Sequence, residues 1–258
     1  MINYLFAQKG TTIGIREFWQ CSKLHEITIP SSVTSIGKYA FWECTSIKRI
    51  TIPSSVLSIG DGAFRICSSL KEIIIPSSVA SIGESAFDQC KKLKRIEIPS
   101  SVISMGNNLF NECSSLKEAV LNNSLVVVGY STFKGCSSLT KIKIPSSVTV
   151  IDSFAFYGCT SLEEITIPKS VTSIDYNAFS GCSSLANVIF EEPSSLTSIG
   201  DSSFRKCIKL TQITIPSTVE LIERDSFREC SCLKEITISS SITPLNIGIN
   251  SNVKVIKI

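Results

Sequence analysis

The sequence predicts a repeat solenoid: a curved parallel β-sheet of short strands, with short strands and 3-10 or helical turns on the other side, built from 23-residue repeats. Three observations predict it. Cysteine recurs every 23 residues from Cys21 to Cys182 and again, after a slip of two residues, at Cys207 and Cys230. Phenylalanine stands three residues before each of these cysteines, and leucine or isoleucine stands three residues after. A fixed period of this length is typical of stacked repeats that share one interior.

Each repeat, called a rung below, has three predicted parts. The pattern LxxIxI alternates inward and outward, as a strand with one buried face does. A proline then ends the strand because it lacks an N–H group. The segment SSVTSIG is expected to turn the chain, with Gly37, Gly60, Gly83 and Gly106 at tight bends. AFxxC returns the chain and places the phenylalanine in the centre.

The same register reaches both ends of the chain. Residues 1–12 are expected to form a partial repeat, because subtracting 23 from the first strand's core positions gives Met1, Tyr4 and Phe6. Residues 239–258 are expected to form a degenerate repeat with Val253, Ile256 and Ile258 in the strand spacing. With ten Phe/Cys repeats over 13–238, we predict a single solenoid domain over 1–258, complete or part of a longer array.

Composition argues against several classes of protein. The net charge of +3 over 258 residues is too small and too mixed to indicate nucleic acid as a partner. The first residues, MINYLFAQKGTTIG, have no basic segment followed by an apolar run, so we predict no signal peptide. Apolar runs such as EIII are too short to cross a bilayer. The residues alone therefore predict a cytoplasmic protein without membrane insertion.

Residues 70–90, LKEIIIPSSVASIGESAFDQC, resemble the repeat of BspA-like leucine-rich-repeat proteins, also called the Treponema pallidum type, whose pattern is LxxIxIPxxVxxIGxxAFxxC. The resemblance covers residues 13–245, with weaker copies at 102–132 and 239–258. It implies a curved solenoid. It also implies a surface protein that binds host proteins or other cells.

The cysteine column has two interpretations. Neighbouring cysteines would lie within disulfide reach. Each also lies three residues from a core phenylalanine and a core leucine, where a free cysteine behaves as a small hydrophobe. We predict a reduced, buried column, with Cys232 outside it as the most reactive thiol. Because no Cys-x₂-Cys pair exists and His25 is the single histidine, no metal is expected.

Nothing in the sequence predicts catalysis or a cofactor. There is no Ser-His-Asp arrangement, no G-x-G-x-x-G and no P-loop. The adjacent pair Glu163 and Glu164 is expected on solvated surface, and the repeated serines are expected to stabilise turns. The pattern NNS at 122–124 is a glycosylation acceptor in a secreted chain.

Two columns of charge are expected on the strand face. The residues just before the first isoleucine alternate in sign and predict a self-neutralising ladder: Glu26, Arg49, Glu72, Arg95, Glu118, Lys141 and Glu164. One residue earlier, four lysines follow one another in consecutive rungs. They either keep the surface soluble or bind an acidic partner. The basic residues proposed to bind a partner are Lys48, Arg49, Lys71, Lys94, Arg95, Lys117, Lys141 and Lys143.

Trp19 and Trp42 occupy the same position in consecutive rungs, directly after the core phenylalanine. Exposed tryptophans can anchor a partner. The alternative is that they cover the N-terminal end of the core. Both are included among the candidate partner-binding residues.

Taken together, these features predict a non-catalytic protein-binding or adhesion module that binds an acidic or glycosylated protein on its strand face. The first alternative is an intracellular scaffold or regulatory subunit, which a reduced cysteine column favours. The second is the sensing region of a larger protein with its catalytic domain elsewhere. The resemblance, in contrast to composition, implies a location at the cell surface.

Overall fold

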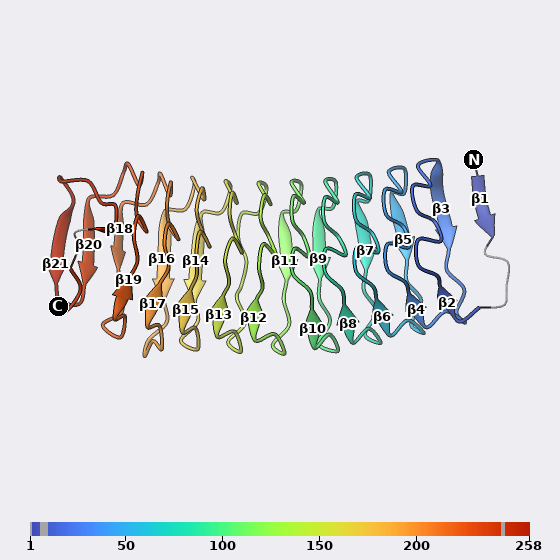
Figure 1. Cartoon of the computed structure of the whole chain (residues 1–258), viewed down its shortest axis with the longest axis horizontal. Coiled ribbons are helices and arrows are strands. Elements are labelled where there is room, and N and C mark those ends of the chain that lie inside the picture. The colour runs from blue at the N-terminus through green and yellow to red at the C-terminus, as the bar shows by residue number, and fades with distance from the viewer. Residues whose placement is uncertain (1, 6–9, 244–245) are drawn as a thin grey trace. The chain divides into compact units, whose positions relative to one another are not determined.

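The computed structural model describes residues 2–5, 10–243 and 246–258, and the chain divides into two compact units, Met1–Ser124 and Leu125–Ile258. Every strand pairing is parallel and joins strands of neighbouring rungs (Figure 1). No helix in the described part of the chain is long and apolar enough to cross a membrane. The prediction of a parallel-sheet repeat solenoid is confirmed, whereas a single domain over 1–258 stays a prediction.

Unit 1 has two rows of strands, one on each of two sides of the rungs. The first row, called the strand face below, comprises β1 (Ile2–Leu5), β3 (Leu24–Thr28), β5 (Arg49–Thr51), β7 (Glu72–Ile74), β9 (Arg95–Glu97) and β11 (Glu118–Val120). The second row comprises β2 (Thr12–Ile13), β4 (Ser35–Ile36), β6 (Ser58–Ile59), β8 (Ser81–Ile82) and β10 (Ser104–Met105). Hydrogen bonds join the sheets β1-β3-β5-β7, β9-β11 and β2-β4-β6-β8-β10.

Unit 2 repeats this arrangement. Its strand-face row comprises β14 (Glu164–Ile167), β16 (Asn187–Phe190), β18 (Gln212–Thr214), β20 (Glu235–Ile238) and β21 (Lys254–Lys257). Its second row comprises β12 (Val127–Val128), β13 (Val150–Ile151), β15 (Ser173–Ile174), β17 (Ser198–Ile199) and β19 (Leu221–Ile222). The pattern predicts a further strand at 139–144; Ile142 and Ile144 are buried there as expected, but the segment lies outside any strand.

The two-residue slip is absorbed without a break in the stack. Glu164 of β14 pairs with Asn187 of β16, an offset of 23, whereas Ser173 of β15 pairs with Ser198 of β17, an offset of 25. The extra residues therefore lie in the turn between β16 and β17, where the two strand rows do not constrain chain length.

Buried phenylalanines form the centre of each unit. The rings of Phe18, Phe41, Phe64, Phe87 and Phe110 stack with centroids 5.1–5.7 Å apart and planes within 9° of parallel. In unit 2 the same stack runs through Phe133, Phe156, Phe179, Phe204 and Phe227 at 5.1–5.6 Å. These distances fall in the range of favourable aromatic pairs, so each ring stabilises its neighbours in addition to being removed from water.

The third side of each rung is the turn that contains AFxxC, called the turn side below. Within a rung it has i to i+3 hydrogen bonds, such as Ala40 N to Gly37 O at 3.2 Å and Cys44 N to Phe41 O at 3.1 Å. Between rungs it forms a third ladder, as when Phe41 N donates to Ala63 O at 2.7 Å. The return is thus made of 3-10-like turns, one of the predicted forms.

Two residues of each turn have a left-handed backbone. In the second rung of unit 1 they are Tyr39 (φ 57°) and Glu43 (φ 59°), and in the next rung Gly62 (φ 57°) and Ile66 (φ 60°). Few residues other than glycine adopt this conformation without strain, and β-branched residues are the least suited. The sequence pattern did not reveal this requirement, because glycine stands at these two positions in only a minority of the rungs.

The glycines of SSVTSIG have a different role from the predicted one. Gly37 and Gly60 do not have a positive φ; their constraint is the approach of the preceding rung. A Cβ on Gly37 would lie 2.7 Å from Ile13 O, and a Cβ on Gly60 would lie 2.7 Å from Lys38 N. Glycine is therefore needed at this corner because successive backbones stack in contact.

The terminal repeats agree with the register only in part. Tyr4 of β1 pairs with Ile27 as predicted, whereas Met1 and Phe6 lie outside the described residues. At the other end Val253 is buried, but Ile258 is 58% exposed, so its predicted place in the core is wrong. The reason is a pairing one residue out of step, in which Ile236 lies opposite Val255. A shift of one residue turns side chains to the opposite face of a strand.

Replacing Ile66 with glycine should stabilise unit 1. Ile66 is a β-branched residue at φ 60°, and glycine removes the steric cost, which we expect to be about 1 kcal/mol. The measurement is the free energy of unfolding in urea. The control is Ile103→Gly, at an exposed position without a positive φ, which should destabilise by about 0.5–1 kcal/mol. A loss of stability in Ile66→Gly would contradict the strain.

Candidate functional site

Four lysines on the strand face of unit 1, called the basic column below, are the strongest candidate for a binding site. Each stands directly before a strand of that face: Lys48, Lys71, Lys94 and Lys117. Their backbones are joined rung to rung, with Lys71 N donating to Lys48 O at 2.9 Å and Lys117 N to Lys94 O at 2.9 Å. Because paired strands lie about 4.8 Å apart, four like charges are held within about 15 Å. All four side chains are exposed.

The neighbouring column neutralises itself. Arg49 Nε lies 3.2 Å from Glu72 Oε2, and Arg95 Nη2 lies 3.6 Å from Glu118 Oε1. The predicted alternating ladder is confirmed for these pairs. Their side chains are more than half exposed, so each pair is worth about 0–1 kcal/mol.

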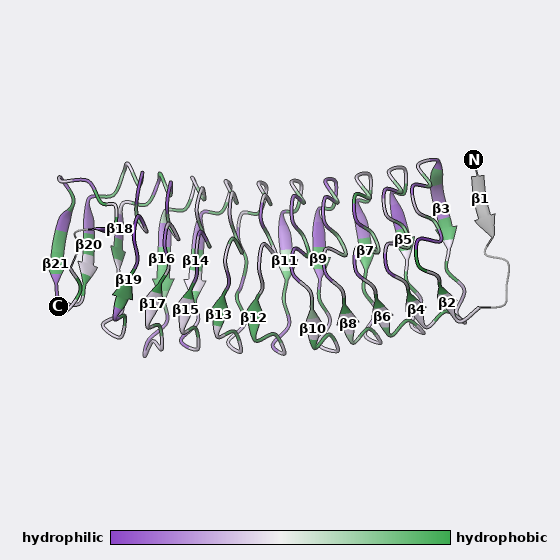
Figure 2. Ribbon diagram, viewed as in Figure 1, coloured by the Kyte–Doolittle hydropathy of each residue, from purple (hydrophilic) through white to green (hydrophobic). Residues whose placement is uncertain are grey.

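The basic column is not neutralised in this way. Among the residues that the structure describes, none of its four lysines forms an ion pair. Figure 2 shows the start of β7, β9 and β11 as hydrophilic. Of the predicted basic residues, the structure therefore distinguishes unpaired lysines from paired Arg49 and Arg95. Lys141 and Lys143 are exposed in unit 2.

An exposed isoleucine lies beside the basic column. Ile74 in β7 is 79% exposed, and it lines a depression of about 460 Å³ together with Arg95 and Pro99. A second depression, of about 480 Å³, is lined by His25, Glu26, Lys48, Arg49 and Lys71. Sequence reasoning missed Ile74, although three successive isoleucines break the alternation that a half-buried strand requires.

The tryptophans lie on the turn side of unit 1. The ring of Trp42 lies 5.9 Å from that of Trp19 and 5.3 Å from that of Tyr39. Arg16 lies over Trp19, and Arg65 lies over Trp42, at 5.7 and 5.8 Å from the ring centroids. Trp19 is 43% exposed, whereas Trp42 is half-buried. The two tryptophans are packed in a cluster in which the Trp19 ring is the more exposed. Their role in binding stays a prediction.

The cysteine column is buried and free. Cys44 through Cys230 are buried, Cys21 is half-buried and Cys232 is exposed. Eight buried thiols donate to the carbonyl of the phenylalanine one rung earlier in the same unit, as in Cys44 Sγ to Phe18 O at 3.0 Å and Cys159 Sγ to Phe133 O at 3.1 Å. Burial raises the pKa of Cys44, Cys182 and Cys230 to about 12. These thiols join rungs together and are poor nucleophiles.

The serines and Asn122 have structural partners. The second serine of SSV donates to the previous rung, as in Ser55 Oγ to Val33 O at 2.6 Å and Ser147 Oγ to Leu125 O at 2.6 Å. Asn122 is buried, and its Nδ2 donates to Pro99 O at 2.7 Å and Val102 O at 3.0 Å. The NNS acceptor nitrogen is therefore already engaged in holding the turn.

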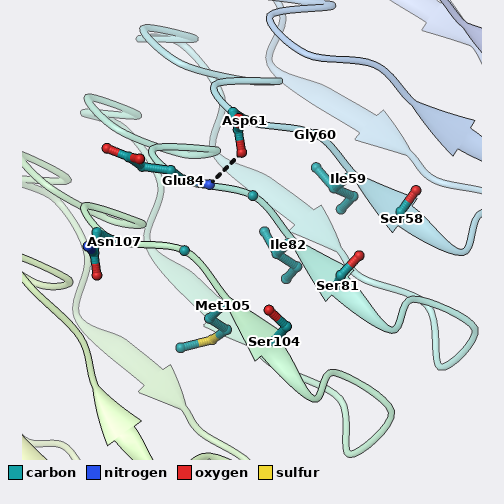
Figure 3. Close-up of a pocket in the computed structure, with 12 residues that line it drawn as sticks. Ser58, Ile59, Gly60, Asp61, Ser81, Ile82, Glu84, Ser104, Met105 and Asn107 are labelled. Carbon is teal, nitrogen blue, oxygen red and sulfur yellow. Dashed lines mark hydrogen bonds between the residues drawn. The ribbon is translucent and has the colours of Figure 1, made fainter.

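A further depression, of about 580 Å³, crosses three rungs at the Ser-Ile-Gly corner (Figure 3). Asp61, Glu84 and Asn107 lie along it, and Asp61 Oδ1 accepts from Glu84 N at 3.0 Å. Within the described residues, no group of three or more His, Cys, Asp or Glu could hold a metal ion. This depression lies at the corner where the backbones of successive rungs are in contact, and its polar groups hydrogen-bond between rungs.

The chain matches the family model described as "BspA type Leucine rich repeat region (6 copies)" over residues 11–140 and 128–257. No curated protein sequence matches the chain. Among solved structures, a leucine rich cell surface protein from Faecalibacterium prausnitzii is 30% identical, with a TM-score of 0.57, and the match covers 96% of this chain and 82% of that one.

Two other solved structures are similar. A leucine-rich repeat protein from Bacteroides ovatus is 26% identical with a TM-score of 0.53, over 100% of this chain and 91% of that one. The pneumococcal vaccine antigen PcpA is 21% identical with a TM-score of 0.57, over 90% of this chain and 68% of that one, and it supports the fold alone.

Iodoacetamide should modify Cys232 and, more slowly, Cys21 in the native protein, and leave the cysteines buried in the column unmodified. The thiolate is the reactive form, so alkylation requires a thiol that the reagent can contact and that can lose its proton. Peptide mass spectrometry gives the modified sites. Denaturation before labelling is the control and should expose every thiol. Rapid native modification of Cys90 or Cys182 would contradict a buried column.

The column should also make stability fall at high pH. The pKa of Cys182 rises from about 9 to about 12 on folding, so the native state retains a proton that the unfolded state has lost. The stability that the buried, protonated thiol contributes is fully present below pH 9 and is lost as pH rises towards 12. The free energy involved is about 1.4 kcal/mol for each unit by which folding raises the pKa. Thermal melts between pH 8 and 11 measure the loss, which should be smaller in Cys182→Ala. An equal slope in that variant would contradict the assignment.

Proposed function

The chain belongs to the BspA-type leucine-rich repeat family, and from this premise we propose that it is a non-catalytic protein-binding module. Its unit 1 binds an acidic protein segment on the strand face. The observation that carries the proposal is the basic column, four exposed and unpaired lysines on consecutive rungs beside the exposed Ile74.

The geometry supports an extended acidic partner for electrostatic reasons. Like charges at this spacing repel one another, and an anionic segment lying along the column would relieve that repulsion. The arginine column offers no comparable attraction because Glu72 and Glu118 already neutralise it. Complementary charge of this kind mainly raises the association rate and selects the partner.

Ile74 adds apolar contact surface, which the charges of the basic column do not provide. Apolar side chains at the centre of an interface contribute more to affinity than exposed charges do, because they are removed from water on binding. Ile74 projects from the middle of the column's rungs, with the depression shared with Arg95 next to it. We therefore propose a partner segment in which one apolar residue is flanked by carboxylates.

Adhesion is the form of binding that we propose, with an intracellular scaffold as the alternative. In support of adhesion, the relative from Faecalibacterium prausnitzii is described as a cell surface protein. In support of the alternative, free cysteines in such number suit a reducing compartment. Burial of the column protects most of these thiols from oxidants, so we give more weight to the family evidence.

Reversing two charges of the basic column should abolish binding without affecting folding. The variant Lys71→Glu/Lys94→Glu should weaken binding of a fluorescein-labelled, glutamate-rich peptide with one central leucine by at least about tenfold, because attraction becomes repulsion. Fluorescence anisotropy measures the affinity, and the melting temperature should stay close to that of the parent, since both side chains are exposed.

Lys234→Glu is the matched control. Lys234 occupies the same repeat position in unit 2, but Thr211 stands there in the preceding rung instead of another lysine. The same charge change there should leave affinity unaltered. Binding that survives the double variant, or that is lost equally in Lys234→Glu, would overturn the basic column as the site.

A further inference from the structure

Unit 2 has an aromatic residue where the backbone least favours one. Phe154 has φ 59°, at the first left-handed position of its turn. The same position in the other rungs of unit 2 is occupied by small polar residues that tolerate this conformation: Ser131, Asn177, Ser202 and Asp225. The fold therefore does not require an aromatic side chain here. A strained residue that the fold does not need indicates a function.

Three exposed tyrosines surround Phe154. Its ring makes edge-to-face contacts with Tyr130 at 5.7 Å, Tyr157 at 5.6 Å and Tyr176 at 5.2 Å. The tyrosines are 41%, 39% and 48% exposed, respectively, and they come from three consecutive rungs on the turn side. With Phe154 they form one continuous surface, called the aromatic patch below.

The aromatic patch carries one positive charge. Lys134 Nζ lies 5.7 Å from the ring centroid of Phe154 and 5.9 Å from that of Tyr157. In the described part of the chain Lys134 has no carboxylate partner. The ring faces hold the ammonium in place by cation–π attraction and leave its charge open to an anion.

A column of glycines runs beside these rings. Gly135, Gly158 and Gly181 have φ of 71–76° at the second left-handed position, where later rungs of unit 2 have Lys206 and Glu229. A Cβ on Gly158 would meet no atom closer than 3.9 Å, and one on Gly181 none closer than 3.6 Å. Space alone would admit side chains at Gly158 and Gly181, and it is the positive φ that favours glycine there. Their omission in these three rungs leaves bare backbone next to the rings.

We propose that the aromatic patch binds an oligosaccharide that carries a carboxylate. The C–H faces of sugar rings would stack on the tyrosine and phenylalanine rings, the tyrosine hydroxyls would hydrogen-bond to sugar hydroxyls, and Lys134 would pair with the carboxylate. The glycine column lets the chain of sugars lie close to the backbone. This site is separate in residues and chemistry from the protein-binding strand face of unit 1.

The size of the patch favours a glycan over a protein. Three consecutive rungs span about 10 Å, since strands lie about 4.8 Å apart. A stable protein interface covers about 800 Å² on each partner and has a dry apolar centre. The aromatic patch is narrow, and Lys134 lies over two of its rings. A second cation near Tyr157, Arg205, is already paired with Glu229. These are the dimensions and polarity of a short oligosaccharide.

The test is calorimetric titration of the whole chain with acidic and neutral probes. The acidic probes are a hyaluronan hexasaccharide and 3′-sialyllactose, and the neutral ones are maltohexaose and lactose. At least one acidic probe should bind more tightly than its neutral counterpart. Phe154→Ser, which installs the residue found at Ser131 and Ser202, should weaken that binding by at least about tenfold. Lys134→Gln should remove the preference for the acidic probe.

Folding and charge provide the controls. Phe154→Ser should keep or raise the melting temperature, because it removes a strained aromatic residue, and a marked fall would show that Phe154 is structural and overturn the proposal. Lys71→Glu/Lys94→Glu should leave oligosaccharide binding unaltered; loss in that variant would assign binding to the basic column instead. Failure of both acidic probes to bind, or patch variants that affect only a protein partner, would also overturn it.

Discussion

The structure depends on exact repetition along each stack, and the constraint that enforces it is the buried phenylalanine column. Rings only 5.1–5.7 Å apart and nearly parallel leave no room for a rung to shift. Buried cysteines within each unit then donate to the carbonyl of the phenylalanine one rung earlier, as Cys67 does to Phe41 and Cys182 to Phe156, so backbone and side chain repeat together. A free thiol suits this place because it is small, apolar and still a weak donor. The rigid interior explains why the serine, glycine and proline positions repeat as well.

Strict stacking has a consequence for the surface. Any residue type repeated at an outward position becomes a column with a spacing of about 4.8 Å, whatever its charge. The chain uses this in two ways on the strand face of unit 1. Alternating signs give pairs such as Arg49 and Glu72, which cancel, whereas the lysine beside each of them has no partner of opposite sign among the residues that the structure describes. The same strands can thus arrange charges so that neighbours cancel, and the basic column does not follow that arrangement.

The turn side carries the second kind of departure. Its two left-handed positions are occupied by many residue types, and aromatic residues stand there at Tyr39 and Phe154. Tyr39 lies against Trp42 in unit 1, and Phe154 lies against three tyrosines in unit 2. Conformational strain together with clustered exposed rings is the basis on which we propose Phe154 as a binding position. The strand face of unit 1 and the turn side of unit 2 thus present different chemistry.

The period, the core columns, the parallel stack and the free cysteines were all predictable from the residues alone, because each depends on residue types that recur from rung to rung. The sequence also contained the signal for Ile74 in the run of three isoleucines. Only the tertiary structure decided which charges pair, which turn residues are left-handed and how β21 is registered. The aromatic patch belongs to this second group. In the sequence, Tyr130, Phe154 and Tyr176 lie 22 to 24 residues apart and form no recognisable motif. They meet because rungs stack, and contacts across a stack follow from its geometry rather than from local sequence preference.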